Sequence, residues 1–218
     1  MTATMRSAAG SVKHAVGRRY NAVRRAPRVR QARRKVFIDC GANTCTVLRE
    51  FVGQFPDFEF FAFEAQPELA PEGERVIREL PDTQIQHFTK AVWIRDETLS
   101  FYLATQWGPN YRGGSTLMTG HVNNQSAIDY QRPVQVEGFD FSKWLGENFG
   151  PDDYVIVKMD IEGAEYEVLE KVIADGNLGL IDEMIVEFHH HMNDSISKSR
   201  HDELVRTLRR SCRLEIWH

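Results

Sequence analysis

The chain has 218 residues, of which 42% are hydrophobic and 27% charged, a composition that suits one globular domain with a sizeable core. No apolar run approaches the roughly 18 residues of a membrane span, and the N-terminus lacks the apolar segment of a secretory signal. The 3 cysteines do not form a disulfide framework or a four-cysteine metal site, so we expect a cytoplasmic protein.

Charge is distributed unevenly along the chain. The first 35 residues hold 11 of the 27 basic residues and no acidic one, and Asp39 is the first carboxylate. The remainder holds 16 basic against 31 acidic residues, a net charge of −15. This pattern predicts a basic N-terminal arm, residues 1–34, ahead of an acidic domain, residues 35–218. We expect the arm to be a solvated segment or a packing surface of a homodimer rather than a binding site for an anionic surface, and a cleavable organellar presequence is the remaining alternative.

Strand and helix patterns alternate from Lys35 onward. Short β-branched or aromatic runs predict strands, and apolar residues recurring every three or four positions predict helices. In chain order the predicted strands are 35–38, 58–63, 85–88, 91–94, 99–103, 134–139, 154–158, 184–188 and 214–217, and the helices lie around 47–52, 67–80, 141–149, 168–173 and 204–208. Such alternation predicts a doubly wound, mostly parallel α/β sheet of the Rossmann-like class.

Two features interrupt this regular alternation. Residues 91–94 and 99–103 flank the turn Arg95-Asp96-Glu97, a pattern that predicts an inserted β-hairpin. Residues 105–133 are polar and rich in Gly, Asn and Gln. A connection of this length inside a domain is usually either functional or disordered.

The turn after the first strand has the features of a cofactor loop. Ligands of such sheets bind beyond the carboxyl ends of the strands. Here the chain reads Asp39-Cys40-Gly41-Ala42-Asn43-Thr44, where Gly41 permits a tight turn and the next helix offers free N–H groups. Glu64 ends the second strand, 23 residues after Gly41, where a carboxylate can accept both ribose hydroxyls of a nucleoside cofactor. The alternative is a simple turn in which Asp39 caps the helix.

The same loop discriminates between cofactors. A dinucleotide site requires Gly-x-Gly-x-x-Gly to accommodate a pyrophosphate, whereas this loop has one glycine and the carboxylate of Asp39. That negative charge repels a pyrophosphate but tolerates the ammonium group of an aminoacyl ligand. The loop therefore favours S-adenosylmethionine over a nicotinamide dinucleotide, and a transferase over an oxidoreductase.

Four motifs, taken together, resemble those of the FkbM family of S-adenosylmethionine-dependent methyltransferases. They are Asp39-Cys40-Gly41-Ala42-Asn43, Phe63-Glu64-Ala65-Gln66-Pro67, Val157-Lys158-Met159-Asp160-Ile161-Glu162-Gly163-Ala164-Glu165 and Val186-Glu187-Phe188-His189. The resemblance spans roughly residues 35–192. The chain departs from the family at Cys45, where a glycine is usual, which suggests a narrower pocket. It also has one strand after the last helix, where the family usually has an antiparallel pair.

The resemblance implies methyl transfer to an oxygen, commonly on a saccharide or a polyketide. It places Asp39–Thr44 around the aminoacyl end of the cofactor, Glu64 on the ribose, Ala65 and Gln66 near the adenosine, and the Ala91 backbone near the adenine. We expect the long polar loop to cover the acceptor, with Trp107 and Tyr111 as flat faces and Asn110, Ser115 and Thr116 as hydrogen-bonding groups. An ordinary surface loop is the equally weighted alternative.

A sugar hydroxyl needs a base, a metal ion or both before it attacks a methyl sulfonium. Asp160 ends one predicted strand, and Glu187 and His189 end the next. Alternation along a strand places Glu187 and His189 on one face, and neighbouring strands lie about 5 Å apart. Two arrangements follow: His189 accepts the proton, or Asp160, Glu187 and His189 hold a cation such as Mg²⁺, resembling catechol-type O-methyltransferases. Lys158 and Glu162 would position either arrangement.

Two further classes compete with a small-molecule methyltransferase. A nucleic-acid protein is suggested by the basic arm, but the net charge of −15 beyond residue 35 repels phosphates. The segment after Asp160 is Ile-Glu-Gly rather than the Pro-Pro-aromatic motif of DNA amino-methyltransferases. An inactive interaction module with the same fold is the second competitor, and only an assay separates it from an enzyme.

Overall fold

The computed structural model describes residues 26–80, 83–105, 113–122 and 127–217. Its centre is a 6-stranded sheet in the order β11-β10-β9-β1-β2-β3, in which every neighbouring pair is parallel. The strands are β1 (Lys35–Cys40), β2 (Glu59–Phe63), β3 (Ile85–Phe88), β9 (Tyr154–Met159), β10 (Glu183–Glu187) and β11 (Arg213–Trp217). The predicted Rossmann-like α/β class is confirmed.

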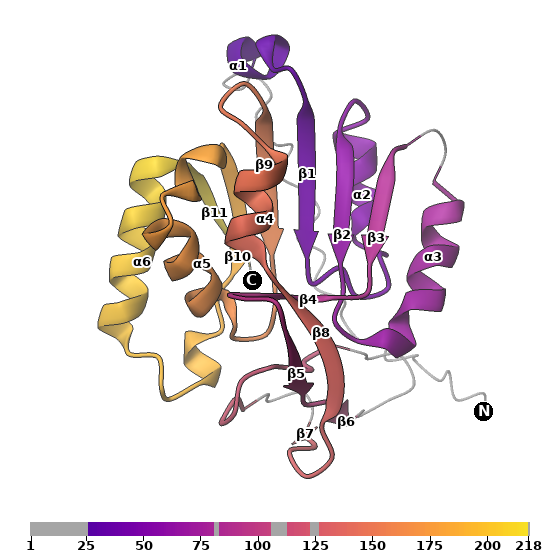
Figure 1. The fold of residues 1–218 in the computed structure, drawn as a ribbon, viewed down its shortest axis with the longest axis vertical. Coiled ribbons are helices and arrows are strands. Elements are labelled where there is room, and N and C mark those ends of the chain that lie inside the picture. Colours follow the sequence, from indigo (N-terminus) through magenta and orange to yellow (C-terminus); the bar gives the residue numbers. More distant parts are fainter. Residues whose placement is uncertain (1–25, 81–82, 106–112, 123–126, 218) are drawn as a thin grey trace, which may run out of the picture.

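Helices cover both faces of this sheet (Figure 1). They are α2 (Leu48–Gln54), α3 (Ala70–Arg78), α4 (Phe141–Asn148), α5 (Glu165–Ala174) and α6 (Lys198–Ser211), with 3₁₀ turns η2 (Pro67–Leu69), η3 (Asn177–Leu180) and η4 (His190–Met192). Alternate residues of β1 face opposite layers: Val36 and Ile38 pack with α4, α5 and α6, whereas Phe37 packs with α2 and α3. These two apolar layers hold the sheet between the helices. Because its strands are parallel, their carboxyl ends lie along the same edge of the sheet.

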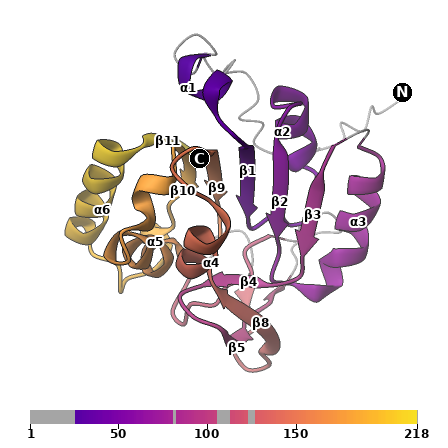
Figure 2. The ribbon, with the colours of Figure 1, turned by 45° about the horizontal axis from the view of Figure 1, so that its top comes forward.

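A second sheet lies beyond the carboxyl ends of the central strands, as both ribbon views show (Figures 1 and 2). It consists of β4 (Ala91–Trp93), β8 (Val134–Asp140) and β5 (Glu97–Phe101), in the order β4-β8-β5. The predicted hairpin is therefore wrong in its pairing, because β8 lies between the two strands that were expected to pair. β8 is parallel to β4 and antiparallel to β5.

Gly138 explains how one strand fits between the other two. It pairs with Ala91 on one side and with Glu97 on the other. A Cβ atom at this position would come within 2.4 Å of Leu99 Cδ1, so the missing side chain lets β5 pack closely. Local patterning cannot reveal this arrangement, since the intervening strand comes from about 40 residues later in the chain.

The last part of the basic segment is attached to the domain. Residues Ala26–Gln31 form α1, which lies beside the amino end of β1 (Figure 1). Arg33 makes a two-pronged contact with buried Asp153, at 3.0 and 2.9 Å, and Arg34 contacts Glu59 in the same way, at 3.1 and 2.7 Å.

The long connection between β5 and β8 contains the short pair β6 (Ala104–Thr105) and β7 (Ala127–Ile128). No helix within the described ranges combines the length and the hydropathy needed to cross a bilayer.

Candidate functional site

The cofactor loop, Asp39–Thr44, turns sharply at the end of β1. Gly41 has φ +84°, and a Cβ atom there would lie 1.9 Å from the Asp160 carbonyl oxygen. The backbone N–H groups of Gly41 and Ala42 both donate to Phe63 O at 2.9 Å. Asp160 N in turn donates to Cys40 O at 3.0 Å. Glycine is required here because the backbone is left-handed and because the Asp160 carbonyl, just after β9, approaches closely. Hydrogen bonds also join the loop to the ends of the two neighbouring strands.

Glu64 links the cofactor loop to the segment after β2. Its Oε2 atom accepts from Asn43 N and its Oε1 atom accepts from Gln66 N, both at 2.8 Å. The carboxyl group is almost buried, and burial raises the pKa of Glu64 despite these two donors. Each oxygen retains a lone pair, so a carboxylate held in this way can still accept from a ligand hydroxyl.

Asp39 is buried and is not open to a ligand as expected. Its side chain is fully buried and its Oδ1 atom lies 3.0 Å from Lys158 Nζ, which also donates to Gly41 O at 3.0 Å. Burial alone would lower the pKa of Lys158, but Asp39 and Asp160 raise it well above its usual range. We therefore revise the sequence interpretation of Asp39 as a contact to the aminoacyl group. Because Lys158 already balances its charge, Asp39 supports the loop from beneath.

Cys45, at the family's glycine position, keeps a glycine-like backbone. Its φ is +57°, in the left-handed region that disfavours a Cβ atom. The side chain is fully buried in the apolar layer between the sheet and the helices α2 and α3. The expected narrowing of the pocket therefore does not follow, since the sulfur packs into the core.

The turn after β9, residues 160–165, is the acidic turn of the site. Glu165, fully buried at the start of α5, accepts from Ile161 N at 2.9 Å and from Gly163 N at 3.0 Å. The same carboxylate lies 2.9 Å from Nδ1 of His189. Because a carboxylate accepts, Nδ1 carries the proton, and the other nitrogen of His189 is directed into the turn.

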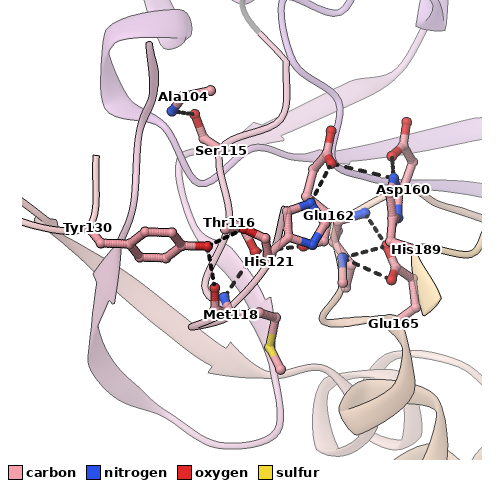
Figure 3. A network of polar contacts seen from close by, with 12 residues as sticks. Ala104, Ser115, Thr116, Met118, His121, Tyr130, Asp160, Glu162, Glu165 and His189 are labelled. Carbon is pink, nitrogen blue, oxygen red and sulfur yellow. Dashed lines mark hydrogen bonds and ion pairs between the residues drawn. The ribbon is translucent and has the colours of Figure 1, made fainter. Parts of the chain in front are cut away.

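The Nε2 atom of His189 faces two more carboxylates (Figure 3). It lies 3.4 Å from Glu162 Oε2 and 3.9 Å from Asp160 Oδ1, so the predicted proximity of Asp160 and His189 is confirmed. Burial alone would lower the pKa of His189, but the charges of Glu165, Glu162 and Asp160 raise it to about 10. Burial and the charge of Glu162 raise the pKa of Asp160 to about 7, although Lys158 opposes the shift.

Glu162 is held in place by the long loop. Its φ of +53° is unfavourable for a residue with a side chain, and its carbonyl oxygen accepts from Thr116 Oγ1 at 2.6 Å. The Glu162 carboxylate is also near the Gly114 backbone N–H and lies 3.5 Å from Nε2 of His121. Burial alone would raise the pKa of Glu162, but these contacts and His189 lower it. A strained residue held by several contacts is typical of a functional turn.

Glu187 does not join this cluster, contrary to the sequence interpretation. Among the described residues, the acidic and histidine side chains that converge to ligand distance are Asp160, Glu162 and His189. The chain leaves the extended conformation at His189, with φ −102° and ψ 24°, and enters the 3₁₀ turn η4. The strand alternation that was expected to align Glu187 with His189 therefore ends before His189.

The remaining predicted positions fall into three groups. Trp107, Asn110 and Tyr111 lie outside the described residues. Ser115 Oγ lies 3.3 Å from Gln66 Oε1, beside the cofactor loop, and also accepts from Ala104 N. Thr116 is fully buried and donates its hydroxyl to Glu162 O, so it anchors the loop rather than contacting an acceptor as expected.

Ala91, expected near the adenine, is the first residue of β4. It is buried, pairs with Gly138, and packs with Ala65 and Leu117 in a small apolar cluster. This cluster joins the second sheet to the segment after β2. Any contact between Ala91 and a cofactor would therefore use backbone groups of a strand that is already paired in the second sheet.

Two residues of the site were not predicted from the sequence. Glu165 belongs to the motif used for the family resemblance, and its position at the start of a helix, where carboxylates are favoured, was an available signal. His121 comes from the long loop, 68 residues before His189, and nothing in its local sequence marks it. Its inclusion depends on Tyr130 OH, which donates to His121 O, and on a backbone bridge between His121 and Asn193.

Comparison with known proteins agrees with this geometry. The family model described as the methyltransferase FkbM domain matches residues 39–213, which is most of the chain. Neither a curated protein nor a solved structure matches significantly. The match includes the cofactor loop, Glu64, the acidic turn and His189. The chain therefore belongs to the FkbM family of methyltransferases.

Proposed function

We propose that the protein is an S-adenosylmethionine-dependent O-methyltransferase that acts on a hydroxyl group of a saccharide or similar small acceptor, polyketides included. The observation that carries this proposal is the direct contact between the cofactor loop and the acidic turn. Gly41 packs on the Asp160 carbonyl, and Lys158 lies between Gly41 O and Asp160, at 3.0 and 3.8 Å. A methyl donor bound at the cofactor loop would thus lie beside a cluster of proton acceptors in the acidic turn.

On the cofactor side, Glu64 would accept the ribose hydroxyls. The backbone around Asn43 and Thr44 lies at the aminoacyl end, and Ala65 and Gln66 lie along the adenosine. Support comes from the position of Glu64 between the two loops, 2.8 Å from Asn43 N and from Gln66 N. A ligand in contact with this carboxylate would touch both strand ends.

On the acceptor side, Asp160 is the group most available to a hydroxyl. Its side chain is 26% exposed, compared with 19% for Glu162, 3% for His189 and 0% for Glu165. In the proposed reaction the hydroxyl oxygen attacks the methyl carbon, the carbon–sulfur bond breaks, and Asp160 takes the proton. Asp160 replaces the His189 base expected from the sequence, because the neighbouring carboxylates raise the pKa of His189 to about 10. The products are a methyl ether and S-adenosylhomocysteine. His189, oriented by Glu165, then holds Asp160 and Glu162 in position.

Calorimetry with S-adenosylhomocysteine tests the cofactor half of the proposal. Glu64→Ala should weaken binding by about 10- to 100-fold, because hydrogen bonds to a charged group contribute about 1.5–3 kcal/mol. Glu68→Ala, in the exposed part of η2, is the matched control and should bind as the parent does. Equal affinity of Glu64→Ala and the parent would refute the role of Glu64.

The acceptor half needs a transfer experiment. The protein is incubated with S-adenosylmethionine carrying a ¹³C methyl group and a panel of saccharides, hydroxylated polyketides and, for contrast, amines. A ¹³C signal at the shift of a methyl ether supports O-methylation. Cofactor binding without transfer to any hydroxyl, or transfer to nitrogen alone, would contradict it.

A further inference from the structure

We propose that the acidic turn binds a divalent transition metal ion of the Zn²⁺ or Co²⁺ kind, with Asp160, Glu162 and His189 as its ligands. This ion site rests on the proposed function in that it shares Asp160, Glu162 and His189 with it, but the experiment that tests the ion site does not require methyl transfer. The three ligand atoms converge within 4.8 Å of one another in the structure. His121, which does not belong to this converging set, lies beside it and contacts Glu162.

The separations between these atoms distinguish metal ligands from hydrogen-bonded partners. His189 Nε2 lies 3.4 Å from Glu162 Oε2 and 3.9 Å from Asp160 Oδ1. Hydrogen bonds of this type span about 2.7–3.2 Å. Ligand atoms at about 2.0–2.1 Å from a tetrahedral ion lie about 3.4 Å from each other, close to the values here.

His121 is the independent observation that points to a ligand. Its side chain is fully buried, and within the described part of the chain neither ring nitrogen makes a hydrogen bond. A buried polar group without a hydrogen bond costs free energy, so a partner is expected. The ring lies beside Glu162 (Figure 3), with Nε2 at 3.5 Å from Glu162 Oε2. A water molecule bound to the ion would give His121 Nε2 the hydrogen-bond donor that it lacks.

The surroundings of His189 match those of a metal-bound imidazole. The ring nitrogen remote from the cluster, Nδ1, contacts buried Glu165 at 2.9 Å. Metal-ligating histidines regularly donate their other N–H to a carboxylate, which orients the ring and strengthens the ligand. Glu165 is itself fixed by two backbone N–H groups of the turn, at 2.9 and 3.0 Å.

The ligand set also selects the class of ion. An imidazole among the ligands suits Zn²⁺, Co²⁺ and related ions, whereas Mg²⁺ prefers oxygen ligands and water. The sequence interpretation with Mg²⁺ at Asp160, Glu187 and His189 is thereby revised in both the ion and the ligands. When bound, the ion would lower the pKa of an acceptor hydroxyl coordinated on the exposed side of Asp160.

The test uses the full chain freed of metal with a chelator and titrated with Co²⁺, whose visible d–d bands report on its ligands. We expect micromolar or tighter binding, displacement by Zn²⁺, and little competition from Mg²⁺. Absence of binding up to millimolar Co²⁺ would overturn the proposal. A thiolate-to-cobalt charge-transfer band would also overturn it, by placing the ion on a cysteine.

Variants assign the ligands. Asp160→Asn, Glu162→Gln and His189→Gln should each weaken Co²⁺ binding by more than the roughly 10- to 100-fold expected for the outer partner variant Glu165→Gln. His121→Gln should weaken binding less than these three variants, since His121 contacts Glu162 but is not itself a ligand. Glu187→Gln and His190→Gln are the matched controls and should bind as the parent does.

Each variant is first titrated with S-adenosylhomocysteine, so that loss of the fold is separated from loss of the ion site. Unaltered Co²⁺ affinity in His189→Gln or in Glu162→Gln would place the ion elsewhere and reject the assignment. Metal binding without any methyl transfer would leave the ion site standing and refute the proposed function. Methyl transfer by a protein that binds no metal would do the reverse.

Discussion

The cofactor loop and the acidic turn lie side by side, yet they are built from different groups. The cofactor loop depends on backbone: a glycine that no other residue can replace without a clash, and N–H groups that converge on Phe63 O and Glu64. The acidic turn depends on side chains that arrive from three distant segments, with Glu162 held at a positive φ. One region should therefore be sensitive to added volume, and the other to changed chemistry.

The largest expected effect lies in the acidic turn. His189→Ala should reduce kcat by about 100-fold, the lower end of the range for proton-transfer catalysis, because it removes the imidazole that holds the proton acceptor Asp160 in position, while the affinity for S-adenosylhomocysteine is kept. His190→Ala is the control, because that ring stacks on His201 at 3.9 Å and lies outside the cluster. The measurement is steady-state methyl transfer with calorimetry in parallel. Near-normal kcat in His189→Ala would remove His189 from the chemistry.

The next effect lies in the cofactor loop. Gly41→Ala should destabilise the fold by about 2–3 kcal/mol, since it combines a left-handed backbone with a Cβ atom that would lie 1.9 Å from Asp160 O. Gly53→Ala offers the opposite case: Gly53 lies inside α2, with nothing within 4 Å of an added Cβ. There the substitution should stabilise the protein by about 0.5–1 kcal/mol. Urea denaturation of both variants checks the pair, and equal stabilities would contradict it.

Strained positions in the two regions provide a smaller and sharper comparison. Cys45 and Glu162 have φ values of +57° and +53°, so glycine should be more stable than alanine at each position by about 1 kcal/mol. The consequences for function should differ. Cys45→Gly should retain methyl transfer, whereas Glu162→Gly should lose it, since only Glu162 directs a side chain into the site. Loss of activity in Cys45→Gly, in a folded protein, would refute this distinction.

The smallest effect is expected at the N-terminus. Removing residues 1–25 should leave methyl transfer and Tm nearly unchanged. Removal through residue 34 should lower Tm, because it deletes the contacts of Arg33 with Asp153 and of Arg34 with Glu59. Thermal denaturation of the two truncations gives the comparison. A loss of turnover after removal of 1–25 would show that the arm takes part in the reaction.

Much of the fold could be predicted from the sequence because its signals are local. The alternation of apolar runs with helical spacing identified all six central strands, and their parallel order follows from the helices between them. The pairing of β4, β8 and β5 could not be predicted. It depends on Gly138, a residue whose role appears only when two strands approach it from opposite sides.

The sequence by itself determined the positions whose chemistry is carried by neighbours in the chain: Gly41, Glu64, Asp160 and the motif that ends in Glu165. Only the tertiary structure decided which charged groups meet. Asp39 and Thr116 make internal contacts, with Lys158 and with the Glu162 carbonyl. Glu187 lies outside the cluster because the strand ends before His189, and His121 reaches Glu162 from a distant loop. The physical reason is that charge balance and burial depend on distances across the fold, and no residue spacing in the chain encodes those distances.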